Sequence, residues 1–154
     1  MSRSIEAEID VLTGSHAWSA TPDNDSSLRS VMLGRDGTGT VLDGYGQTIY
    51  AGIDVRFEVT APGVLRFDDL ETPRMQRRPP FVPTESTGSK AVVFSLTEGG
   101  RVFREDVTGF VFRFSWTLEF AEPPYPDGLT FPCTVPTVFY GYREKIGDRF
   151  TPLP

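Results

Sequence analysis

The stretch Phe110 to Phe120, with the sequence FVFRFSWTLEF, decides the fold. Large apolar side chains stand at every second position, and most positions between them are polar. Alternate residues of a strand point to opposite faces, so this period of two gathers the rings on one face, whereas a helix would scatter them around its circumference. The stretch therefore predicts a long strand with one apolar face, made of Phe110, Phe112, Phe114, Trp116, Leu118 and Phe120, and one polar face, made of Arg113, Ser115, Thr117 and Glu119.

Residues 49–59 repeat the same period and predict a second long strand. Its apolar face is made of Ile49, Ala51, Ile53, Val55, Phe57 and Val59, and its polar face of Asp54, Arg56 and Glu58.

Short turn sequences separate the other segments. Residues 35–39 contain Asp-Gly, a pair that favours the positive φ angles of a tight hairpin. Residues 61–63, Ala-Pro-Gly, predict a second hairpin, and residues 98–100, Glu-Gly-Gly, predict a third one between strands at 91–97 and 101–105. A last strand is expected from Thr137 to Lys145, and almost no helix is expected in the chain.

The number of strands favours a closed sheet. Eight or nine short strands joined mainly by tight turns are typical of an up-and-down antiparallel β-barrel or of a β-sandwich. The barrel is preferred because closure hides the two long apolar faces and removes unpaired strand edges. The length of 154 residues predicts one all-β domain over residues 1–154.

Several residues near the start of the chain suggest a family. Gly14-Ser15-His16-Ala17-Trp18, followed by residues 28–33 and by Asp36-Gly37-Thr38-Gly39, resembles the opening of lipocalin-like (calycin) barrels. Tyr142-Arg143 on the last expected strand adds to this, because lipocalins often place an arginine against the first-strand tryptophan at the closed end. The resemblance implies a cup-shaped pocket for a small apolar molecule. Some barrels of this kind catalyse isomerisation, cyclisation or decarboxylation without a cofactor.

Charge and composition limit the partners. A net charge of −6 opposes binding to nucleic acid, and Arg74, Arg77 and Arg78 form the one basic cluster, in a proline-rich stretch that reads as a solvated loop. No segment is long and apolar enough to predict a membrane span. Cys133 is the single cysteine, which favours a reducing, cytoplasmic location. His16 is the single histidine, so neither a metal site nor a cofactor is expected.

The candidate ligand-binding residues follow from the strand faces. Phe112, Phe114 and Trp116 would line the barrel if the ring face points inward, although core packing explains the same pattern. The phenols of Tyr50, Tyr140 and Tyr142 could donate hydrogen bonds in a cavity. Arg113 and Glu119 would join the site only if the polar faces turned inward and met Arg56 and Glu58 as a buried charge cluster.

Three functions are compatible with these features. The leading hypothesis is a module that binds a small hydrophobic or aromatic molecule. The second is a cofactor-free enzyme of the isomerase or cyclase type, acting on a substrate of secondary metabolism. The third is a structural or interaction module that uses the proline-rich segments 72–84 and 122–136.

Overall fold

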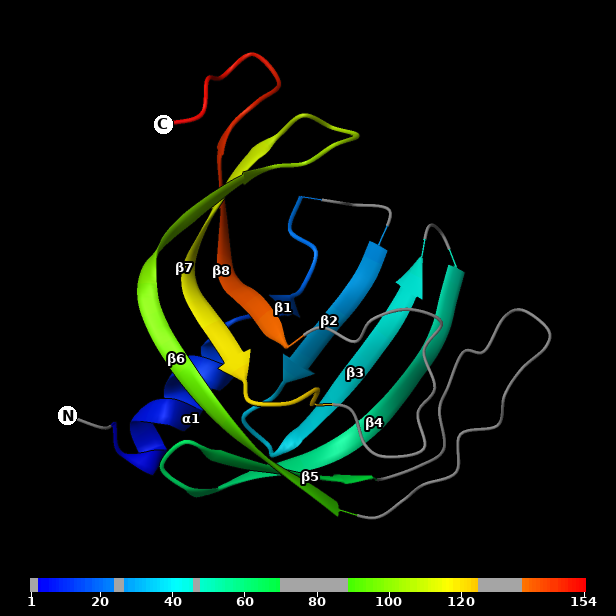
Figure 1. Ribbon diagram of the computed structural model, residues 1–154, viewed down its shortest axis with the longest axis vertical. Coiled ribbons are helices and arrows are strands. Elements are labelled where there is room, and N and C mark those ends of the chain that lie inside the picture. The colour runs from blue at the N-terminus through cyan, green and yellow to red at the C-terminus, as the bar shows by residue number, and fades with distance from the viewer. Residues whose placement is uncertain (1–2, 24–26, 46–47, 70–88, 125–136) are drawn as a thin grey trace.

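The chain folds into a closed antiparallel β-barrel with one short helix (Figure 1). This computed structural model describes residues 3–23, 27–45, 48–69, 89–124 and 137–154, and within its strands it describes only the backbone of residues 27–29, 42–45, 48–54 and 69. Consecutive strands pair in up-and-down order, and the pairing of Ser19 in the first strand with Tyr140 in the last closes the ring. The predicted all-β barrel is confirmed.

The elements are short except for β4 and β6. The helix α1 spans Ile5–Gly14, and the strands are β1 (Trp18–Ser19), β2 (Ser27–Leu33), β3 (Thr38–Tyr45), β4 (Thr48–Ala61), β5 (Val64–Asp69), β6 (Ser89–Arg104), β7 (Val111–Phe120) and β8 (Val138–Gly147). The predicted segments 72–84 and most of 122–136 lie outside the described residues, as do Arg74, Arg77, Arg78 and Cys133.

The main core lies on the apolar faces that the alternation predicts. In β4, Val55, Phe57 and Val59 are buried while Arg56 and Glu58 are exposed. In β7 the predicted ring face is also the buried one, with Phe112, Phe114, Leu118 and Phe120 buried. Aromatic rings from three strands meet in this core, where Phe120 packs against Phe67 at 6.4 Å and against Phe139 at 5.7 Å between ring centroids.

Two of the predicted hairpins are present. The chain turns between β2 and β3 with Gly37 at a φ of +84°, and between β4 and β5 with Gly63 at a φ of +76°. Glycine adopts such angles without steric cost, which explains why these positions carry it.

The third predicted hairpin is wrong. Strand β6 runs without a break through Gly99 and Gly100, and a β-bulge lies between Glu98 and Arg101. Both halves of β6 pair with β7, from Phe94 opposite Phe120 to Arg104 opposite Val111, and the chain reverses at 105–110 instead. The two glycines therefore bend one long strand, because residues without side chains suit a bulge as well as a turn.

The helix α1 was not predicted, and its signals are readable in retrospect. Ser4 caps it by accepting a hydrogen bond from the Ala7 N–H at 3.1 Å, a typical N-cap arrangement. Ile5, Ile9 and Leu12 follow the spacing i, i+4, i+7 and pack against the main core. Within the described part of the chain, no helix is long and apolar enough to cross a membrane.

Candidate functional site

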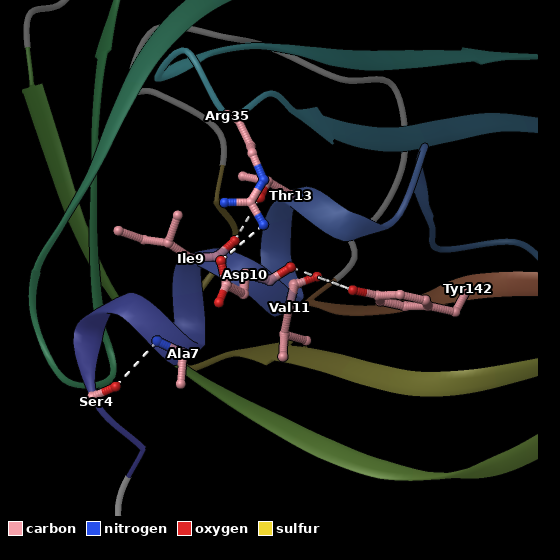
Figure 2. A network of polar contacts seen from close by, with 8 residues as sticks. All are labelled: Ser4, Ala7, Ile9, Asp10, Val11, Thr13, Arg35 and Tyr142. Atoms are coloured by element: carbon pink, nitrogen blue, oxygen red, sulfur yellow. Dashed lines mark hydrogen bonds and ion pairs between the residues drawn. The ribbon is translucent and has the colours of Figure 1, made fainter.

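One end of the barrel is closed by α1, and the helix together with Arg3 just before it is bonded to three separate parts of the ring. The Asp10 carboxylate pairs with Arg35 in the β2–β3 turn at 2.8 Å (Figure 2). The Glu8 carboxylate accepts the N–H of Gly63 in the β4–β5 turn at 2.9 Å, and the Arg3 guanidinium donates to the Leu96 carbonyl of β6 at 3.0 Å. These contacts hold the helix across the strand ends.

Tyr142 of β8 provides a fourth attachment for the helix. Its hydroxyl donates to the Val11 carbonyl at 2.8 Å, near the C-terminal end of α1 (Figure 2). Burial raises the pKa of the Tyr142 phenol, which keeps it protonated and able to donate. The Tyr142 backbone has a φ of +62°, which is uncommon for a residue other than glycine, and its N–H donates to the Ser15 hydroxyl at 3.0 Å. The phenol predicted to face a ligand is thus bonded to α1.

Trp18 completes the closed end. It has no exposed surface, and its indole N–H donates to the Leu12 carbonyl at 2.9 Å. Its ring lies directly over Gly141, where an added Cβ would stand 2.6 Å from a ring carbon. The resemblance implied an arginine against this tryptophan, but Tyr142 takes that place, with its ring edge-on to Trp18 at 6.0 Å. Arg143 instead lies over the ring of Phe112 at 4.6 Å.

A second aromatic cluster lies on β6, β7 and β8 and in the turn that joins β6 to β7. Phe103 packs edge-on against Phe114 at 5.8 Å and against Tyr140 at 4.9 Å, and Phe110 packs against Phe112 at 6.5 Å. Phe112 and Phe114 are buried, yet neither belongs to the main core cluster. Figure 1 shows the β6–β7 hairpin and the C-terminal segment at one end of the molecule, above the rest of the ring. The rings thus form an apolar cluster of their own.

Strand register places basic side chains among these rings. Arg101, Phe114 and Arg143 form one row across β6, β7 and β8, while Phe103, Phe112 and Lys145 form another row. Residues directly opposite each other in antiparallel strands project to the same face, and two steps along a strand return to that face. We call these six residues the aromatic–cationic face. The Lys145 ammonium also lies 3.6 Å from the ring centroid of Phe110.

The other predicted site residues are distributed around the barrel. Trp116 is partly buried, packs against the main core and has the Arg3 guanidinium over its ring at 5.0 Å. Tyr50 belongs to β4, and its side chain is outside the described part of the structure. Arg113 and Glu119 are exposed, and their register puts them on the face opposite to the rings.

The alternative with a buried charge cluster is wrong. Arg113, Glu119, Arg56 and Glu58 are all exposed, because the apolar faces of β4 and β7 point inward and leave the charged faces in solvent. Among the described residues, the two buried polar side chains are Glu8 and Ser15, and both are hydrogen bonded at the closed end.

The sequence reasoning did not place Phe103, Arg101 or Lys145 in a site, and it expected Arg143 against Trp18 rather than among these rings. Arg101 and Phe103 were hidden by the false hairpin, which separated them from the strand that contains Phe94 and Leu96. Arg143 and Lys145 stand two positions apart in β8, and this alternation was the available signal.

An open groove of about 610 Å³ lies outside the aromatic cluster, between the end of α1 and the β2–β3 hairpin. Thr13 and His16 form part of one wall, and Met32, Thr38 and Thr40 form part of the other. The hydroxyls of Thr13 and Thr38 already donate, to the Ile9 carbonyl and to the Asp36 carboxylate. Within the described residues, no group of three or more histidine, cysteine, aspartate or glutamate side chains is placed to hold a metal ion.

Comparisons with known proteins give no relative for this barrel. No protein-family model matches the chain, and searches of curated proteins and of solved structures found no match either.

Proposed function

We propose that this protein binds a small, flat, apolar molecule at the aromatic cluster of β6, β7 and β8. The observation that carries the proposal is a set of rings outside the main core whose edge members are only partly buried. Phe103, Phe110 and Tyr140 retain exposed surface beside the buried Phe112 and Phe114. An aromatic ligand stacking there would remove that surface from water and gain ring–ring contacts.

The proposed function agrees with a lipocalin-like (calycin) origin of the barrel. The resemblance of residues 14–18 and 36–39 to such barrels implies a small apolar ligand. In support, a first-strand tryptophan lies at the helix-closed end, and the aromatic cluster lies on strands of the same barrel. The family assignment is part of the proposal.

A fluorescence titration with N-phenyl-1-naphthylamine tests the proposal. This uncharged probe has two flat rings and becomes brighter in an apolar site. We expect saturable binding to the wild-type protein and weaker binding to Phe103→Leu, because the smaller side chain removes a ring from the cluster.

Phe150→Leu is the matched control, since this phenylalanine is 86% exposed and lies outside the cluster. It should bind the probe as the wild type does. Absence of saturable binding, or an equal loss of probe affinity in Phe103→Leu and Phe150→Leu, would contradict the proposal. Melting curves of each variant show whether it remains folded.

A further inference from the structure

We infer that the preferred ligand of the aromatic–cationic face is an apolar molecule with an anionic group, such as an aromatic sulfonate or carboxylate. The inference rests on the proposed function and specifies its ligand class. The juxtaposition that points to it is two neighbouring rows of side chains that combine rings with cations: Arg101–Phe114–Arg143, in which a ring lies between two cations, and Phe103–Phe112–Lys145, in which a cation ends a pair of rings.

The basic side chains of this face are available to an anion. Arg101, Arg143 and Lys145 are exposed, and none of them forms an ion pair with another of the described residues. Two of them already lie against rings, with Arg143 over Phe112 and Lys145 over Phe110. A cation that rests on a ring is held in place, so less side-chain entropy is lost when an anion binds it.

Glu98 and Asp148 lie near this face and offset part of the charge of its three cations. Glu144 stands between Arg143 and Lys145 in β8, and its register with Arg113 puts it on the opposite face. Glu98 shares its row with Trp116, one row beyond Arg101. Asp148 keeps a lowered pKa chiefly through a hydrogen bond from the Phe150 N–H, with a smaller contribution from the charge of Lys145.

The net negative charge of the chain opposes binding of anions elsewhere on the protein. A protein with a net charge of −6 repels anions in general, so a preference for an anionic probe has to come from a local arrangement of cations. The aromatic–cationic face provides such an arrangement beside an apolar surface. Arginine and lysine each donate to sulfonate or carboxylate oxygens, while the rings hold the apolar body.

Two probes with the same aromatic body separate the contributions of charge and rings. 1-Anilinonaphthalene-8-sulfonate carries a sulfonate that N-phenyl-1-naphthylamine lacks. We expect the sulfonate to bind more tightly at low salt and to lose this advantage as salt rises, because salt screens exposed charges. The uncharged probe should be insensitive to salt over the same range.

Variants assign the effect to particular side chains. Arg143→Gln combined with Lys145→Gln should weaken sulfonate binding about five- to tenfold, as expected from removing two exposed charge contacts, and should leave the uncharged probe nearly unchanged. Arg143→Lys keeps the charge and should retain most of the affinity. Arg113→Gln, which removes one positive charge from the opposite face of β7, should change neither titration.

The outcomes distinguish the inference from the proposed function. Equal binding of the two probes, or equal losses in the double variant and in Arg113→Gln, would overturn the anionic preference while leaving the apolar site in place. Failure of both probes would overturn the proposed function itself. Near-ultraviolet circular dichroism of each variant excludes probe binding to a loosened fold.

Discussion

Two aromatic regions of the barrel differ in how their polar groups are used. At the closed end, Trp18 is fully buried and its indole N–H, like the hydroxyl of Tyr142, is bonded to a carbonyl of α1. On the aromatic–cationic face, Phe103 remains partly exposed beside the buried Phe112 and Phe114, and Arg101 and Arg143 have no ion-pair partner among the described residues.

The difference separates a region that stabilises the fold from one that can receive a ligand. Among the described residues, both buried polar side chains, Glu8 and Ser15, lie at the closed end and have a partner, as expected where an unpaired group would cost about 1–3 kcal/mol. The exposed cations beside the partly exposed ring of Phe103 bring no comparable gain to folding, since isolated surface charges contribute little. Substitutions in the first region should therefore change stability, and those in the second should change binding.

The largest effect is expected for Trp18→Ala. Removing a fully buried indole and its bond to Leu12 should lower the free energy of unfolding by about 3–5 kcal/mol. Phe103→Ala, in the other region, should cost distinctly less because that ring is only partly buried. Urea denaturation gives the free energy of unfolding of each variant. Equal decreases in the two variants would contradict the distinction between the regions.

A smaller destabilisation is expected for Gly141→Ala. The new Cβ would stand 2.6 Å from the Trp18 ring and 2.9 Å from the Ser15 hydroxyl, and such overpacking typically costs about 1–3 kcal/mol. Gly100→Ala on the aromatic–cationic strands is the control, because its Cβ would meet Arg113 at an ordinary 3.5 Å. The melting temperature of Gly141→Ala should be clearly lower than that of Gly100→Ala. The reverse order would contradict the described packing.

Tyr142→Phe tests one hydrogen bond of the closed end by itself. The ring contacts with Trp18 and Trp116 remain, while the bond to the Val11 carbonyl is lost, at a cost of about 0.5–1.5 kcal/mol. Amide hydrogen exchange should become faster in α1, whereas β7 stays as protected as before. Unchanged protection of α1 would show that the hydroxyl does not hold the helix.

The smallest effect is expected for Asp36 in the β2–β3 turn and concerns the melting temperature at acid pH. Hydrogen bonds from the Thr38 hydroxyl and N–H lower the pKa of Asp36 below its usual 3.8. A carboxylate with a lowered pKa contributes stability above the pKa of the unfolded chain and loses it as the pH falls through the folded value. Asp36→Asn should therefore flatten the acid decline of the melting temperature slightly. A carboxyl titration by NMR with a midpoint at or above 3.8 would contradict the assignment.

Periodicity predicted most of the barrel, because strands with one buried face reveal themselves residue by residue. The alternation in residues 49–59 and 110–120 and the glycines at 37 and 63 sufficed for β4, β7 and two turns. The glycines at 99 and 100 were ambiguous, since a bulge and a turn require the same lack of side chains. The site was harder to predict, because Arg101 meets Phe114 and Arg143 only through the register of three strands, and register depends on the whole sheet.

A single measurement tests directly whether the rings of β6, β7 and β8 bind ligand while the closed end serves the fold. Backbone amide shifts of the labelled protein can be followed by NMR during titration with N-phenyl-1-naphthylamine. We expect the saturable shifts to concentrate at residues 101–114 and 140–145, with α1 unaffected. Shifts centred on α1 or on the groove beside His16, with none on the aromatic–cationic face, would contradict the account.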